Sequence, residues 1–123
     1  MHELTVAIQI RRALEAELES ETEMLIATAV RVQVGALSGV VPEALEFAWP
    51  HAVADSRALS GARLDIDRID VQLHCPACDD VYVVSELTSM RCPSCRAAGI
   101  QVIAGDELDI ASVDLEQPDR ERP

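Results

Sequence analysis

The sequence predicts an α+β fold in which two helices pack on a small three-stranded sheet and a module built around four cysteines is inserted. Three observations lead to this expectation. Apolar residues recur at helical spacing in two stretches, strand-like alternation occurs in three others, and every cysteine lies between residues 75 and 95. In a chain of 123 residues, setting aside roughly 25 for the module leaves only a small core.

The first helix is predicted over residues 4–18, where apolar residues recur three and four positions apart and form one stripe. Ser20–Glu23 is a polar break. Residues 29–34 then alternate with period two, which predicts a half-buried strand, and residues 35–39 predict a turn. The helical stripe consists of Leu4, Ala7, Ile8, Ile10, Leu14 and Leu18.

Pro42 is predicted to be the first residue of a second helix, because its missing N–H costs nothing at that position. Pro50 interrupts the apolar stripe that follows, so we expect the helix to kink there or to end near Trp49. The stripe consists of Leu45, Ala48, Trp49, Ala52 and Val53.

A long strand is predicted to lead into the cysteines. Residues 64–67 alternate between apolar and acidic side chains, residues 69–73 continue in the opposite phase, and a bulge near Asp67 and Arg68 would reconcile the two phases. A third strand is predicted over residues 107–115. Since these two strands flank the cysteines, we expect them to form an antiparallel pair with the module at its far end. The polar tail, residues 116–123, is predicted to be disordered.

The cysteines form two Cys-x-x-Cys hooks separated by thirteen residues. Each hook can supply two sulfurs from one tight turn, and the loop between them lets the hooks face each other. Four thiolates close a tetrahedral site with no open position, which favours structural zinc. Asp79 and Arg96 follow the hooks, where many zinc knuckles have glycine in a left-handed conformation. The expected zinc ligands are Cys75, Cys78, Cys92 and Cys95.

Other uses of the cysteines fit less well. Disulfides suit short secreted chains, but Arg11, Arg12 and several glutamates interrupt any apolar run that could form a signal peptide. A thioredoxin-like redox pair would use one hook and not two. Iron stays open as an alternative to zinc, because a rubredoxin-like centre uses the same four thiolates.

Charge and motifs exclude several classes of function. The net charge of −12, with 22 acidic and 10 basic residues, opposes nucleic-acid binding, and one Phe, one Trp and one Tyr provide few platforms for stacking bases. Residues 75–98 are not basic either, which weakens the alternative of a zinc ribbon that contacts nucleic acid or a transcription complex. No apolar run approaches the about 20 residues of a membrane span. Without a phosphate loop, a His-Glu-x-x-His motif or a serine nucleophile motif, we expect no enzyme.

The first residues offer a second metal site. The amine of Met1, the amide nitrogen of His2 and its imidazole can chelate one ion in two fused rings, and such a planar nitrogen set suits Ni(II) or Cu(II). The amine titrates at about pH 8 and the imidazole at about pH 6.5, so both donors are available around neutral pH. We do not expect His51 or His74 to be ligands, although His74 could hydrogen-bond a ligating sulfur.

Four features occur in a familiar order over about residues 1–115. These are the start Met-His-Glu-Leu before a helix, the segment GALSGVVPEALEF at 35–47, the two hooks, and Gly-Asp-Glu-Leu at 105–108. Together they resemble the HypA/HybF family of hydrogenase-maturation nickel metallochaperones. The resemblance implies a nickel-binding α/β domain of residues 1–74 plus 99–115 and an inserted zinc module of residues 75–98.

The resemblance also implies a function. Such a protein delivers Ni(II) for the maturation of [NiFe]-hydrogenase in the cytoplasm, together with a pathway GTPase of the HypB type and the hydrogenase large subunit. It acts as a monomer or homodimer, binds neither nucleic acid nor membrane, and is not an enzyme. Zinc is structural and nickel is the cargo.

Residue by residue, the family's nickel site corresponds to Met1, His2 and Glu3, and its zinc site to the four cysteines. Two departures matter. Val41 stands where some members have an acidic residue linked to nickel, and no histidine follows Cys92. The fourth nickel ligand is therefore unassigned.

Overall fold

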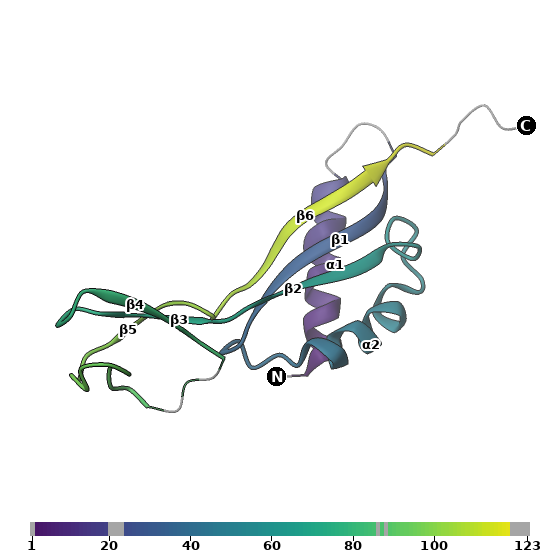
Figure 1. The fold of residues 1–123 in the computed structure, drawn as a ribbon. Helices are drawn as coiled ribbons and strands as arrows, with labels where there is room; N and C mark the ends of the chain where they lie inside the picture. Colours follow the sequence, from purple (N-terminus) through teal and green to yellow (C-terminus); the bar gives the residue numbers. More distant parts are fainter. Residues whose placement is uncertain (1, 20–23, 86, 88, 119–123) are drawn as a thin grey trace, which may run out of the picture.

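The computed structural model describes residues 2–19, 24–85, 87 and 89–118, and Figure 1 shows their arrangement. Within these ranges the chain forms two helices and six strands. In chain order they are α1 (Glu3–Glu19), β1 (Ile26–Gly35), α2 (Pro42–Val53), β2 (Arg63–Ile69), β3 (Val71–Cys75), β4 (Asp80–Val84), β5 (Gln101–Ala104) and β6 (Leu108–Glu116).

The first sheet has the strand order β2-β1-β6, with β1 parallel to β2 and antiparallel to β6. Both helices cover the same face of this sheet (Figure 1). Alternate residues of β1 point into the core, and the indole N–H of Trp49 donates to the Ala62 carbonyl at 3.0 Å beneath α2. The predicted α+β architecture of two helices on a three-stranded sheet is confirmed. Buried residues at the centre of this core include Val6, Ala7, Val30, Val32, Leu45, Val53 and Leu59.

The second sheet has the order β4-β3-β5, is antiparallel throughout, and extends away from the helices (Figure 1). It carries the cysteines and begins at Val71 and ends at Ala104, so it is wider than the predicted module of residues 75–98. The division into domains stays a prediction. The small core of this sheet consists of Val71, Leu73, Cys75, Cys92 and Ile100.

The prediction of one bulged strand from residue 64 to residue 73 is wrong. The chain leaves the first sheet after Ile69, passes through Asp70 outside any strand, and enters the second sheet at Val71. The reversal of the apolar phase therefore marks a change of sheet, because each sheet buries its own set of alternate residues.

The predicted pairing of the two strands that flank the cysteines is also wrong. β2 and β6 lie on opposite sides of β1 and do not pair with each other. The central place goes to β1, whose buried residues are apolar over its whole length, whereas β2 and β6 are less buried edge strands. Antiparallel pairing near the module occurs instead between β3 and β5.

The second helix does not end near Trp49. It continues through Pro50 to Val53. Pro50 lies on the exposed side in the last turn, where the backbone carbonyl that loses its partner can bind water, and the buried side chains of Ala52 and Val53 hold this turn against the core. Pro42 begins the helix as predicted.

A tight junction joins the two sheets. The backbone N–H of Gly35 donates to the Glu107 carbonyl at 2.7 Å, and the Leu37 N–H donates to the Gly105 carbonyl at 2.6 Å. A β-carbon on Gly35 would lie 2.1 Å from the Gly105 oxygen, so only glycine allows this approach. Gly105 itself has a φ of +112°, and a β-carbon there would lie 2.7 Å from Val71 Cα.

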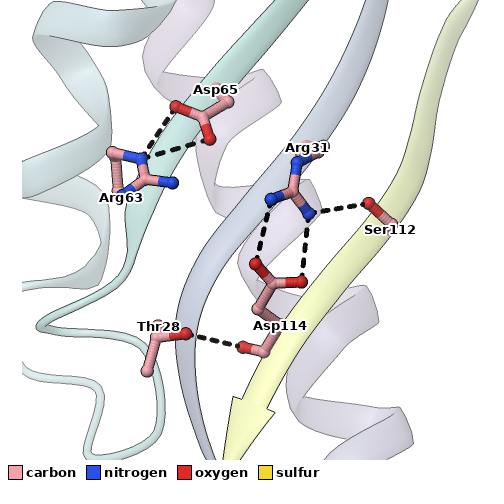
Figure 2. Close-up of polar contacts among 6 residues, drawn as sticks. All are labelled: Thr28, Arg31, Arg63, Asp65, Ser112 and Asp114. Carbon is pink, nitrogen blue, oxygen red and sulfur yellow. Dashed lines mark hydrogen bonds and ion pairs between the residues drawn. The ribbon is translucent and has the colours of Figure 1, made fainter.

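The other face of the first sheet is polar (Figure 2). Arg31 of β1 binds Asp114 of β6 through both guanidinium nitrogens, at 3.0 and 2.9 Å, and donates to Ser112 Oγ at 3.2 Å. On β2, Arg63 Nε donates to both carboxylate oxygens of Asp65. These ion pairs bridge neighbouring residues on an open, hydrated surface, where such pairs contribute little to stability.

The hydrogen bonds from Arg31 lower the pKa of the Asp114 carboxyl below its usual range. Ionised Asp114 therefore stabilises the fold at neutral pH, and this stabilisation is lost as the pH falls through the lowered pKa. We expect Arg31→Gln to return the pKa of Asp114 toward the ordinary value and to cost little stability at pH 7. An NMR titration of the side-chain carboxyl carbon checks this, and an unchanged midpoint in the variant would contradict the pairing.

Two predicted segments lie wholly or partly outside the described residues. These are the polar break at Ser20–Glu23 and the part of the predicted disordered tail beyond Pro118. The prediction that the tail begins at residue 116 is wrong, because Glu116 belongs to β6. In the part of the chain that is described, neither helix has the length and apolar character needed to cross a bilayer.

Candidate metal centre

The two cysteine hooks are tight turns. The first lies between β3 and β4, where the Asp79 N–H donates to the Cys75 carbonyl at 2.7 Å; the second is equivalent, with the Arg96 N–H donating to the Cys92 carbonyl at 3.1 Å. Asp79 and Arg96 have φ values of +57° and +64°, the left-handed conformation in which many zinc knuckles place glycine. Aspartate adopts it more readily than arginine.

The structure brings the four cysteine sulfurs together, all within 4.8 Å of one another. Cys75 Sγ lies 3.6 Å from Cys95 Sγ, and Cys78 Sγ lies 3.8 Å from Cys92 Sγ. Sulfurs bound at about 2.3 Å to one tetrahedral ion lie about 3.8 Å apart. The cluster therefore has the dimensions of a closed four-thiolate site. Among the described residues, no second group of three His, Cys, Asp or Glu side chains is close enough to hold a metal.

Backbone amides prepare the cluster for negative charge. Burial alone would raise the pKa of Cys92, but the N–H groups of Cys95 and Ser94, each 3.4 Å from Cys92 Sγ, help to lower it to about 6. The amide of Ala97 acts in the same direction on Cys95, yet the neighbouring sulfurs of Cys92 and Cys75 raise the pKa of Cys95 to about 11. A metal ion must displace the protons that such crowded thiols retain.

Tyr82 and His74 lie near the first hook, but only Tyr82 is seen to contact a sulfur in the described structure. Tyr82 of β4 places its hydroxyl 3.3 Å from Cys78 Sγ, where it can donate to a thiolate. This role of Tyr82 is not predicted from the sequence, where its only signal is a position four residues after Cys78. His74 was expected to contact a sulfur at most, but its Nε2 lies 3.0 Å from Asp79 Oδ1, and this hydrogen bond raises the pKa of His74.

Of the predicted nickel residues, His2 and Glu3 lie at the start of α1, in the half of the molecule that contains the first sheet. Met1 is outside the described residues. The exposed His2 precedes the helix, and its carbonyl accepts from the Val6 N–H at 3.1 Å. Glu3 Oε2 accepts from the backbone N–H of Val41, just before α2, at 3.3 Å. Val41, which stands where some family members have an acidic residue, thus contacts Glu3 through its backbone N–H.

Among the described residues, His51 forms no metal-binding group with His2 and Glu3. It lies exposed on α2, with its ring centroid 5.5 Å from that of Phe47. The structure thus brings together the four cysteines that the sequence predicts as one cluster. Of the predicted N-terminal site, it describes His2 and Glu3 but not Met1.

A sequence model of HypA, described as a hydrogenase/urease nickel-incorporation metallochaperone, matches residues 1–115 of the chain. The chain belongs to the HypA family. This membership confirms the resemblance inferred from the Met-His-Glu-Leu start, the two hooks and the segments between them. It makes the protein a nickel metallochaperone of hydrogenase maturation and not an enzyme.

Individual HypA proteins match over nearly the whole chain. Hydrogenase maturation factor HypA of Roseiflexus sp. (strain RS-1) is 36% identical over 116 residues, which cover 94% of this chain and 93% of that protein. The same factor of Geobacter sulfurreducens is 36% identical over 116 residues, covering 94% and 100%.

Solved structures share the fold. The solution structure of the Ni metallochaperone HypA from Helicobacter pylori matches with a TM-score of 0.67 at 22% identity, covering 96% of this chain and 100% of that one. The likeness supports the α+β architecture with its cysteine-bearing second sheet.

Proposed function

We propose that this HypA protein binds Ni(II) at its N-terminus and delivers it for [NiFe]-hydrogenase maturation, while a structural zinc ion holds the second sheet. The observation that carries the proposal is the match of the HypA family over residues 1–115, which includes both the Met-His-Glu start and the hooks. The two metals have different tasks because their donor sets differ. Four thiolates suit a permanent ion, and an exposed nitrogen chelate suits one that must leave again.

The four-sulfur cluster supports a structural role for its metal. Cys75 and Cys92 are buried and belong to the core of the second sheet, so the bound ion would complete that core. Zinc bound there would supply no catalytic chemistry, because four protein ligands leave no position open. A rubredoxin-like iron centre would have the same ligands, and the absence of red colour in purified protein would exclude it.

The start of α1 supports the nickel chelate. As the residue before the helix, His2 offers its carbonyl to the helix, while an amide N–H at this position has no partner in the helix's own hydrogen bonds. A metal can therefore replace that amide proton without cost to α1. The exposed imidazole of His2 is free to swing toward the same ion, and Glu3 adds nearby negative charge.

Partners and location follow from this proposal. We propose that the chain works in the cytoplasm as a monomer or homodimer, with a HypB-type GTPase of the pathway and the hydrogenase large subunit as partners and without binding nucleic acid. The acidic surface, with a net charge of −12, suits basic protein surfaces and disfavours phosphate backbones.

Acid should release the two metals in two steps. Protons compete with nickel for the nitrogen lone pairs of the amine and the imidazole, so nickel should leave as the pH falls. Zinc held by four thiolates should persist to lower pH. Stepwise acidification of protein loaded with both metals, with each metal measured in the filtrate, tests this.

The matched control is His2→Gln, which removes one nickel donor and no sulfur. We expect this variant to release nickel at higher pH and zinc at the unchanged pH. Simultaneous loss of both metals from the unmodified protein would point to one shared site and contradict the proposed function.

A further inference from the structure

An apolar groove of about 470 Å³ lies between α1 and β6. Leu115 is 44% exposed there, although it points to the side of the sheet that faces the helix. The groove lies on the molecule's first-sheet half, apart from the cysteine cluster. It is lined by Ala13, Leu14 and Leu18 of α1 and by Ile110, Val113 and Leu115 of β6, together with Glu17.

β6 forms one wall of this groove and is also the edge of the first sheet (Figure 1). It is nine residues long and pairs only with β1 among the strands that the structure describes. Its other edge therefore presents backbone N–H and C=O groups that an extended segment could pair with. The inward side chains of such a segment would enter the groove beside Val113 and Leu115.

Three side chains on the opposite face of β6 are acidic. Asp109, Asp114 and Glu116 point away from the helices. Arg31 neutralises Asp114, as Figure 2 shows, but no ion pair with Asp109 or Glu116 is formed among the described residues. An added strand would thus have an apolar surface on one side and negative charge on the other.

The nearby segments of the chain itself do not suit this groove. Residues 20–23, in the connection from α1 to β1, and residues 119–123, at the C-terminal end, are all polar apart from Pro123. A second copy does not suit it either. Two antiparallel β6 strands would bring their acidic rows side by side, and like charges directly across a strand pair are destabilising. The charges that reject another copy attract a basic segment.

We propose that the free edge of β6 binds an extended segment of a partner protein in which apolar and basic residues alternate. The segment adds a fourth strand to the first sheet, places its apolar side chains in the groove against α1, and places its basic side chains beside Asp109 and Glu116. The contact is small, so the complex is transient.

The test uses the full-length, zinc-loaded protein and a labelled nine-residue peptide that alternates valine and lysine and is blocked at both ends. We expect saturable binding by fluorescence anisotropy and slower hydrogen exchange of β6 amides. A peptide of the same composition with the valines and lysines in separate blocks should bind at least about tenfold more weakly, since it cannot present one apolar face.

Leu115→Glu, which places a charge in the groove, should weaken binding of the alternating peptide by about tenfold or more. Phe47→Glu adds the same charge on α2, at a side chain 75% exposed, and should leave binding unchanged. Ala13→Glu tests the other wall of the groove if Leu115→Glu disturbs the fold. Equal binding of the two peptides, an equal effect of the groove and control variants, or exchange protection away from β6 would overturn the proposal. Self-association of the free protein through β6 would also overturn it, since the occupant would then be a second copy.

Discussion

Replacing Cys75 and Cys92 together by alanine is expected to abolish stoichiometric zinc binding and to unfold the second sheet, while the first sheet and its helices stay folded. Each hook loses one of its two sulfurs, so no closed tetrahedral site can form. Sites of this kind contribute on the order of 10 kcal/mol when the metal binds, which a small sheet cannot replace.

The two cores explain why the damage should stay local. The core of the second sheet includes both replaced cysteines, and among the described residues only Val71, Leu73 and Ile100 are buried with them. The core beneath the helices contains none of the cysteines and is much larger. Hydrogen exchange should therefore show lost protection in β3, β4 and β5 and retained protection in β1 and α1.

Ser94→Ala is the matched control, because it removes a side chain from the second hook and keeps the backbone N–H that contacts Cys92 Sγ. This variant should retain one zinc per chain by elemental analysis. If the Cys75→Ala, Cys92→Ala protein also retained one zinc per chain, the four-thiolate assignment would be wrong.

The four-cysteine cluster is predictable from the sequence because its determinants are local. Two cysteines three residues apart must share one turn, and the hook length then requires the left-handed backbone seen at Asp79 and Arg96. The helical stripes were equally readable, since three- and four-residue periodicity needs no knowledge of the partner surface. The end of α2 was not predictable from Pro50 in the same way. The free-energy cost of a proline inside a helix depends on whether the backbone carbonyl that it leaves unpaired is exposed, and this exposure depends on the rest of the fold.

Strand pairing was not predictable in the same way. The sequence between residues 64 and 73 shows a change of phase, but a bulge within one sheet and a passage between two sheets produce the same change. The pairing of β1 with β6 joins residues 74 to 90 positions apart, such as Arg31 and Ser112, which are 81 apart. Contacts such as that of Glu3 with Val41 depend on this topology and leave no periodic signal.

Acetylation of the N-terminal amine is expected to weaken nickel binding by more than about 100-fold while zinc content stays unchanged. Loss of a group that merely supports a metal ligand costs about 10- to 100-fold, and acetylation removes a ligand and one chelate ring. Every side chain remains present, so a site built from side chains alone should be unaffected. The structure supports this comparison, because α1 begins at Glu3 and His2 contributes its carbonyl to the first turn, where it accepts from the Val6 N–H.

Adding a single glycine ahead of Met1 keeps a free amine but changes its position, so it tests the position of the amine separately from its presence. The extension moves the amine by one residue and turns the Met1 nitrogen into an amide, so a different four-nitrogen set can form with the new amine, two amides and the His2 imidazole. We expect the extended protein to keep nickel with a changed absorption spectrum, and the acetylated protein to lose it. Nickel titrations with spectra and zinc analysis on native, extended and acetylated forms make the comparison, with helix content measured on each as the control. Unchanged affinity and spectrum after acetylation would exclude the amine as a ligand and leave nickel to a site made of side chains.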